Sequence, residues 1–332
     1  MAQHNPIVGA LQAGSVDEPQ GQQPGSSLRG LRERALAAWL CADPPAKVAA
    51  VRALAADCGS ETSAPQWPGA SGALGSVDCP APPPLQRGRP APLQPGRPAL
   101  PKLVSAGQVP NRPANTAEGR VALMHAIGHI EFNAIDLALD AIWRFDAMPV
   151  AYYEDWLRVA DEEAQHYALV AQWLVQQGAA YGDCDAHDGL WQMAARTAHD
   201  HLARMALVPA VLEARGLDAT PVIQQRLRST AGDLRNAGDR PAVAALDAAL
   251  RILERILDDE IGHVRIGWHW YRWLCERHRV EPEAHFLVLM EQYGAPWPKP
   301  PVNLGARRAA GFSPALLDRF GEPRKRVKLM SK

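Results

Sequence analysis

Two copies of the motif Glu-x-x-His are the residues in this chain best suited to metal chemistry. The first copy is Glu163-Ala-Gln-His166 and the second is Glu260-Ile-Gly-His263. Residues three apart on an α-helix lie on the same face, so each copy aims a carboxylate and an imidazole in one direction. A single copy occurs by chance on many solvated helices, where an ion pair with a nearby arginine explains it. Two copies in separate long helical segments favour a metal site.

Two more glutamates lie on the apolar sides of the other two long helical segments. Glu131 has Ile127 and Ile135 one turn to either side, and Glu213 follows Ala210. One Glu from each of two helices and Glu-x-x-His from each of two others is the ligand pattern of di-iron and di-manganese carboxylate proteins. Buried carboxylates repel one another and lose hydration, and two cations would offset that penalty. The expected ligands of two metal ions are Glu131, Glu163, His166, Glu213, Glu260 and His263.

The ligand types also indicate which metal to expect. Carboxylates and imidazoles without a thiolate favour iron, with manganese as the alternative, over a structural zinc site. Glu162 and Asp259 each precede a motif glutamate, where a carboxylate can accept a hydrogen bond from a ligating imidazole. Plain surface charge is the other interpretation of these two residues. Tyr167, one turn after Glu163, is a weak candidate for a hydrogen-bonding or redox role, against ordinary core packing.

The apolar periodicity predicts four long helices, over 117–145, 149–178, 190–215 and 241–279. Gly216 marks the predicted end of the third helix, and a short separate helix is expected within 217–238. Pro209 should kink the third helix just before Glu213. No segment alternates with period two, so the expected fold is all-α. Together with the ligand pattern, this predicts a ferritin-like dimetal four-helix bundle over residues 119–279.

The sequence outside the bundle divides into four further regions. Thirteen of the 29 prolines lie between Pro65 and Pro113, where they exclude helix interiors and central strands. The regions expected are a disordered tail (1–25), a short helical pair (26–57), a proline-rich linker or arm (58–118) and a C-terminal extension (280–332) with helical stretches at 282–293 and 313–320.

Composition and sequence patterns indicate which kinds of partner and which cellular compartment to expect. Lys and Arg number 35 against 36 for Asp and Glu, which gives no reason to expect a nucleic-acid or anionic-membrane partner. The five cysteines are widely spaced and form no Cys-x-x-Cys pair, so neither a disulfide framework nor a zinc ribbon is indicated. With no signal-peptide pattern and no apolar run long enough to span a bilayer, a cytoplasmic location is expected.

Several motifs within 120–265 resemble an uncharacterised bacterial family of ferritin-like proteins, known only as a domain of unknown function. The resemblance extends over about 28–56 and 95–310, and residues 58–90 look like a longer insertion. It implies the bundle and the metal site but no reaction. A more remote similarity to tRNA-hydroxylating di-iron mono-oxygenases suggests oxygen chemistry by analogy of fold. The motifs are His125 to Glu131, Asp155 to His166, Tyr181-Gly182-Asp183, Arg204 to Asp218, and Asp259 to His263.

The leading functional hypothesis is a dimetal oxidoreductase that activates oxygen or peroxide on a small organic substrate. Iron binding or ferroxidation without an organic substrate is the second hypothesis, and a structural bundle stapled by metals is the third. About 118 residues before the bundle and about 50 after it argue against a closed storage shell. The chain has no dinucleotide-binding glycine motif, so any reductase is expected to be a separate protein.

Overall fold

Helices make up all the regular structure in the part of the chain that the computed structural model describes, residues 24–59, 94–109 and 113–321. Four of them are long: α3 (Ala117–Arg144), α4 (Val150–Gln176), α7 (Ala214–Asn236) and α8 (Arg240–His278). Within these ranges the only β-type pairing is an isolated bridge between Leu103 and Ala186. The predicted all-α class is therefore confirmed. Most of the predicted tail and the centre of the proline-rich region lie outside the described residues.

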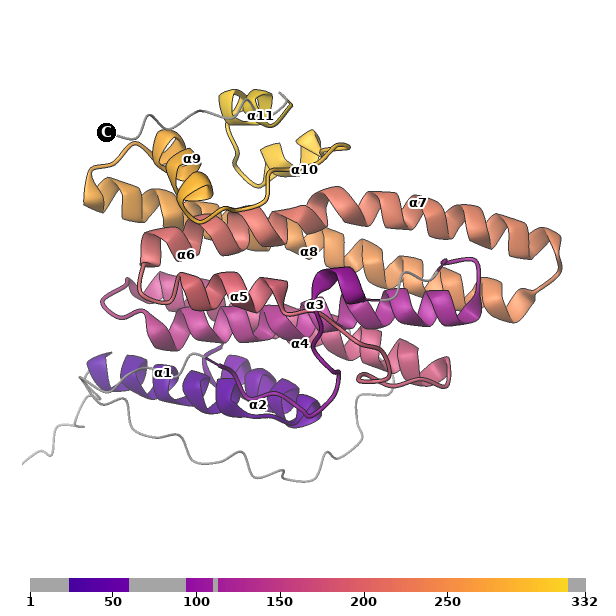
Figure 1. The fold of residues 1–332 in the computed structure, drawn as a ribbon. Helices are drawn as coiled ribbons and strands as arrows, with labels where there is room; N and C mark the ends of the chain where they lie inside the picture. Colours follow the sequence, from indigo (N-terminus) through magenta and orange to yellow (C-terminus); the bar gives the residue numbers. More distant parts are fainter. Residues whose placement is uncertain (1–23, 60–93, 110–112, 322–332) are drawn as a thin grey trace, which may run out of the picture.

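Helices α3 and α4 form an antiparallel pair joined by residues 145–149 (Figure 1). The α3 helix begins where the hydroxyl of Thr116 accepts a hydrogen bond from the backbone N–H of Gly119 at 3.0 Å. Beyond Met124 most of α3 is buried, because α4 covers one side of it and α1 (Pro24–Leu40) covers another. A carboxylate on such a helix needs a partner, and Glu131 is one of these buried residues.

The third long helical segment is interrupted. It consists of α5 (Gly189–Arg196), α6 (His201–Leu207), a π-helical turn η2 (Val208–Glu213) and α7 (Ala214–Asn236). The predicted helix end at Gly216 and the separate short helix within 217–238 are both wrong, because α7 continues through Gly216 and Pro221. Pro221 has no N–H to donate to the carbonyl of Leu217. The side-chain amide of Asn303 donates to that carbonyl at 3.2 Å, so the carbonyl keeps a hydrogen-bond partner that the proline cannot supply.

Pro209 lies in the π-helical turn, close to where the sequence predicted a kink. Without an N–H it cannot bond the carbonyl of Met205, and this favours a wider turn. The turn also lies against α8, because a Cβ atom added to Gly267 would come within 2.3 Å of the Pro209 ring. Glycine at position 267 therefore allows α8 to approach the turn that carries Glu213.

Two glycine substitutions on α8 should have opposite effects on stability. Gly267→Ala is expected to lower the free energy of unfolding by about 1–3 kcal/mol, since the new methyl group meets Pro209. Gly262→Ala has nothing within 4 Å of the new atom and should raise that free energy by about 1 kcal/mol through helix propensity. Urea unfolding of both variants measures the difference. Changes of the same sign in both variants would contradict the close approach.

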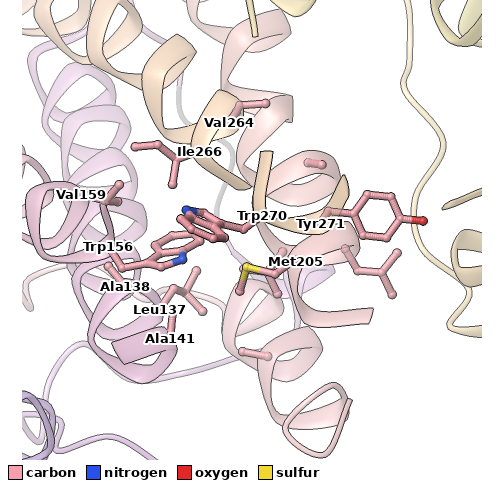
Figure 2. Close-up of a cluster of buried hydrophobic side chains, with 14 of the residues drawn as sticks. Leu137, Ala138, Ala141, Trp156, Val159, Met205, Val264, Ile266, Trp270 and Tyr271 are labelled. Carbon is pink, nitrogen blue, oxygen red and sulfur yellow. The ribbon is translucent and has the colours of Figure 1, made fainter. Parts of the chain in front are cut away.

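Two hydrophobic clusters fill the interior, and the predicted metal ligands lie between them along the helices. On α3, Glu131 lies between Ile127 of the smaller cluster and Ile135 of the larger. On α8, Glu260 lies between Ile256 of the smaller and Val264 of the larger. In Figure 2 the larger cluster brings together side chains from α3, α4, α6 and α8, among them Leu137, Trp156, Met205 and Trp270. A polar layer thus separates two apolar regions of one core.

The N-terminal helical pair, α1 and α2 (Pro44–Asp57), packs on α3 and α4 (Figure 1). Lys47 of α2 is fully buried and forms an ion pair with Asp136 of α3. Its ammonium group also donates to the backbone carbonyls of Trp39 at 3.3 Å and Gly96 at 3.0 Å. These contacts hold Gly96 against the helices. We call residues 94–104, which are part of the predicted proline-rich region, the arm.

The C-terminal extension contains α9 (Pro282–Gln292), α10 (Leu304–Ala309) and α11 (Pro314–Gly321). The sequence predicted α9 and α11 but not α10. Asp218 of α7 holds the start of α10, because it accepts hydrogen bonds from the Arg307 guanidinium at 2.6 Å and from the backbone N–H of Asn303 at 2.9 Å. The acidic end of the motif Gly216-Leu217-Asp218 therefore has a structural role.

The imidazole of His201, at the start of α6, is packed as an uncharged ring. It lies flat against Phe145 with ring centroids 3.9 Å apart, and its Nε2 is 3.1 Å from the Tyr152 hydroxyl. Burial, reinforced by the charge of Arg204, lowers the pKa of His201 to about 3. The folded protein therefore resists protonation of this ring.

This lowered pKa predicts a loss of stability in acid. In the unfolded chain the imidazole titrates near ~6.5, so between that pH and about 3 the unfolded state binds more protons than the folded state. The free energy of unfolding should fall by at most about 1.4 kcal/mol per pH unit as the pH drops through this window. His201→Phe should flatten the dependence in urea unfolding at several pH values, and a change at the exposed His269 should not. An unchanged slope in His201→Phe would be the contrary result.

Candidate metal centre

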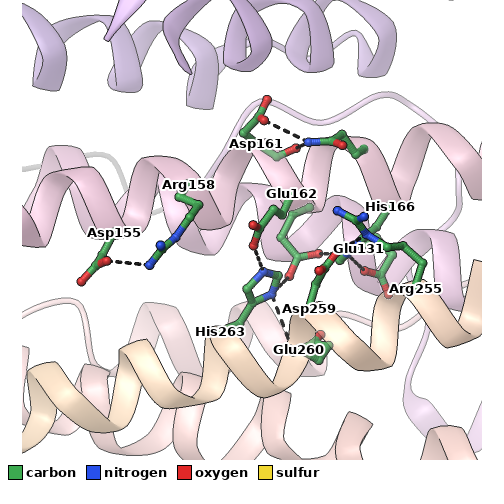
Figure 3. A network of polar contacts seen from close by, with 12 residues as sticks. Glu131, Asp155, Arg158, Asp161, Glu162, His166, Arg255, Asp259, Glu260 and His263 are labelled. Atoms are coloured by element: carbon green, nitrogen blue, oxygen red, sulfur yellow. Dashed lines mark hydrogen bonds and ion pairs between the residues drawn. The ribbon is translucent and has the colours of Figure 1, made fainter. Parts of the chain in front are cut away.

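All six predicted ligands lie in the interior, and none is more than 7 % exposed. Glu131 comes from α3, Glu163 and His166 from α4, Glu213 from η2, and Glu260 and His263 from α8. Figure 3 shows α4 and α8 side by side, with His166 and His263 directed into the space between them. The four helical segments thus contribute the residue types that the sequence pattern assigned to them.

One compact group consists of Glu131, Glu163 and His166, whose potential ligand atoms all lie within 4.8 Å of one another. The Nδ1 atom of His166 is 3.3 Å from a carboxylate oxygen of Glu131 and 3.3 Å from one of Glu163. We call this group the His166 position. Its three side chains converge from two helices on a single point.

A second compact group consists of Glu163, Glu260 and His263, again with potential ligand atoms within 4.8 Å. The Nδ1 atom of His263 is 2.8 Å from Glu163 Oε1 and 3.8 Å from Glu260 Oε2. We call this group the His263 position. Glu163 belongs to both groups, with one oxygen facing each histidine, so the two positions are adjacent and share a carboxylate.

Glu213 lies beside the two compact groups without belonging to either of them. It is 7 % exposed, and its Oε2 atom has no hydrogen-bond partner. Burial, together with the nearby charge of Glu163, raises the pKa of Glu213 to about 8. The charges of His263 and Glu131 also contribute to this shift in the pKa of Glu213.

The donor set of this layer fits a metal centre. Three buried carboxylate oxygens there have no hydrogen-bond partner, namely Glu131 Oε2, Glu213 Oε2 and Glu260 Oε2, whereas Glu163 Oε1 and His263 Nδ1 lie 2.8 Å apart. Orphaned polar atoms are rare in protein interiors because each costs about 1–3 kcal/mol. Burial and the Glu163 charge raise the pKa of Glu131 to about 7, and the same causes raise the pKa of Glu260 well above its ordinary value. Cations at the two positions would satisfy these atoms and remove the repulsion.

The carboxylates that precede each motif glutamate bind the histidine of the opposite motif. Asp259 of α8 has Oδ2 3.0 Å from Nε2 of His166 on α4. Glu162 of α4 has Oε2 2.7 Å from Nε2 of His263 on α8. Each imidazole is therefore held through Nε2, which leaves Nδ1 directed at the glutamates (Figure 3). This is the outer-shell arrangement that fixes the tautomer and orientation of a metal-binding histidine.

Tyr167 has aromatic neighbours. Its ring centroid lies 5.3 Å from that of Phe132 and 5.3 Å from that of Tyr181. Phe132 and Tyr181, with His129 and the arm, line an open cavity of about 430 Å³ on the side of α3 that faces the arm. His129 is about 200° around the helix from Glu131. The cavity and the layer of buried glutamates and histidines therefore lie on different sides of α3. The ring contacts of Tyr167 with Phe132 and Tyr181 favour the packing interpretation of this residue.

Arg255 is a residue of the site that the sequence pattern did not reveal. Its Nε donates to Asp259 Oδ2, the oxygen that also faces His166, and its side chain is 38 % exposed. The available signal was its spacing, one turn before Asp259 on the same helix face. That spacing is common on helix surfaces, so by itself it predicts no role for Arg255. The contact between Asp259 and His166 is what links Arg255 to the site.

Fold and site together define an all-helical protein with a buried layer of glutamates and histidines shared among four helical segments. The chain belongs to the family described as Protein of unknown function (DUF455), whose model matches residues 40–318. An uncharacterized protein of Haemophilus influenzae is 47% identical over 225 residues, which are 66% of this chain and 73% of that protein. No solved structure matches the chain. Among the described residues, no helix is both long and apolar enough to cross a membrane.

Proposed function

We propose that Glu131, Glu163, His166, Glu213, Glu260 and His263 bind two metal ions, and that the four helical segments form a ferritin-like dimetal bundle. The observation that carries the proposal is the shared position of Glu163, which has one oxygen in each compact ligand group. Two cations, one at each position, would account for both groups, and Glu163 would help to hold both of them. Glu213 would supply a further carboxylate, and its Oε2 atom, which has no hydrogen-bond partner, would acquire one.

Iron is the metal that this donor set supports best, with manganese second. The ligands are carboxylates and imidazoles, with no thiolate among them, and such mixed donor sets suit these two metals. A structural zinc site would be closed, with four ligands around one ion. Here two histidines point at separate groups of carboxylates, which favours a dinuclear centre.

The function supported best is that of a di-iron oxidoreductase that activates oxygen or peroxide and oxidises a small organic substrate. Two bound iron ions would supply the site and the electrons for oxygen reduction. The chain itself holds the imidazoles in one tautomer through Glu162 and Asp259 and excludes bulk water with the hydrophobic clusters on either side. A separate reductase would deliver the electrons, because the sequence has no nucleotide-binding glycine motif.

Elemental analysis of aerobically purified protein, followed by absorption spectra during anaerobic reduction and return of oxygen, tests this function. The expected result is about two irons per chain, as the ligand pattern requires, with bands that bleach on reduction and reappear as oxygen is consumed. Oxygen consumption that ends in deposited ferric iron, with elution as a very large particle, would instead favour iron storage. Zinc or no metal in a folded protein would favour a structural bundle.

A further inference from the structure

The two halves of the candidate centre have different surroundings. At the His166 position, the carboxylate behind the imidazole is Asp259, and the guanidinium of Arg255 binds the same oxygen of Asp259. At the His263 position the carboxylate behind the imidazole is Glu162. Among the described residues, the ion pairs formed by Glu162 include no arginine or lysine. Arg255 therefore contacts the carboxylate behind His166, and its charge acts most strongly on that half (Figure 3).

The ligand groups themselves do not offset this difference. Each group contains one imidazole and two glutamates, one of which is the shared Glu163. The two positions therefore differ in the carboxylate behind the imidazole. Asp259 behind His166 also pairs with Arg255, whereas the ion pairs of Glu162 behind His263 include, among the described residues, only that imidazole.

We infer that the two metal positions are unequal, that a divalent cation fills the His263 position first, and that Arg255 weakens binding at the His166 position. A cation binds more tightly where the surrounding negative charge is less compensated. Arg255 draws electron density from Asp259 and so reduces the basicity that Asp259 lends to His166. Its own charge also repels the incoming ion. The inference rests on the proposed metal centre and adds an order of filling and a positioning residue to it.

A purely structural role for Arg255 predicts the opposite effect. If Arg255 served only to hold Asp259 against His166, its loss would loosen the imidazole and weaken binding at the His166 position. If its charge dominates, its loss should strengthen binding at that position. The side chain is 38 % exposed, so its removal leaves no cavity in the core and the variant should fold.

Titration of metal-free protein with Co²⁺ under anaerobic conditions, followed by calorimetry and visible absorption, tests the inference. Wild-type protein should show two binding events of unequal affinity. In Arg255→Ala the weaker event should tighten by about fivefold to tenfold, while the tighter event changes by less than about twofold. Arg255→Lys should retain most of the wild-type difference. Arg251→Ala, an exposed arginine one turn earlier on α8, is the matched control and should match wild type.

His166→Gln and His263→Gln assign the events, since the first should lose the weaker event and the second the tighter one. Should either variant fail to fold by circular dichroism, the Arg255→Ala titration still decides the question. Equal wild-type affinities, a weaker second event in Arg255→Ala, or equal shifts of both events would overturn the inference while leaving the metal centre intact. A wild-type protein that binds no Co²⁺ would overturn the proposed centre itself.

Discussion

Glu163→Ala protein should bind neither metal ion with appreciable affinity, because this single carboxylate belongs to both ligand groups. Its oxygens lie 3.3 Å from His166 Nδ1 and 2.8 Å from His263 Nδ1. Loss of the shared ligand removes one donor from each position, together with the one carboxylate common to both groups among the described residues. A decrease of at least about a hundredfold in affinity at both positions is expected, the upper range for loss of even an outer-shell partner. Metal content after dialysis against dilute Fe²⁺ or Co²⁺ measures it.

Two companion substitutions separate this explanation from general damage. Glu131→Ala removes a ligand from the His166 position alone, so one ion per chain should remain. Glu154→Ala changes an exposed glutamate on the same helix as Glu163 and should leave metal content unchanged. Equal metal loss in Glu131→Ala and Glu163→Ala would show that Glu163 is not shared between two positions. Full metal content in a folded Glu163→Ala protein would remove it from the ligand set.

The residues of the candidate centre could be chosen from the sequence because their spacing carries geometric information. A separation of three places Glu163 with His166, and Glu260 with His263, on one helix face whatever the rest of the fold does. The sharing of Glu163 could not be predicted in the same way. It depends on the axial position and rotation of α4 against α8, which the packing of the two hydrophobic clusters decides.

The third segment shows where local signals fail. The sequence predicts a helix end at Gly216 and a separate short helix within 217–238, but one helix runs through both Gly216 and Pro221. The helix continues because partners distant in the sequence compensate: Asn303 bonds the carbonyl that Pro221 leaves free, and Arg307 binds Asp218. Such partners lie more than 80 residues away, so no local pattern reports them. Pro209 was more informative, because the distortion that it predicts is present: the backbone there forms a π-helical turn.

Removal of the metal ions should destabilise the layer between the two hydrophobic clusters more than the clusters themselves. Without cations, four glutamates at most 7 % exposed face one another with few hydrogen bonds. The larger cluster, around Trp268 and Tyr271, includes none of these residues and should persist. Hydrogen exchange is the suitable measurement. Backbone amides near Glu131 and from Asp259 to His263 should lose protection on chelation, while those near Trp268 keep it. Uniform loss across both regions would contradict a local effect.

The contribution of Glu213 to stability with and without metal can be measured by replacing it with glutamine, a neutral side chain of the same shape. Binding at a free metal concentration one hundred times the dissociation constant contributes about 2.7 kcal/mol per site to the free energy of unfolding. Glu213→Gln keeps the shape of the side chain but cannot ionise. Because burial raises the pKa of Glu213 to about 8, the substitution should stabilise the metal-free protein by about 1–3 kcal/mol. It should also reduce the stabilisation gained on adding metal, since a ligand is lost. If the variant instead stabilised the metal-bound protein as much as the metal-free one, Glu213 would be a buried acid that contributes nothing to the centre.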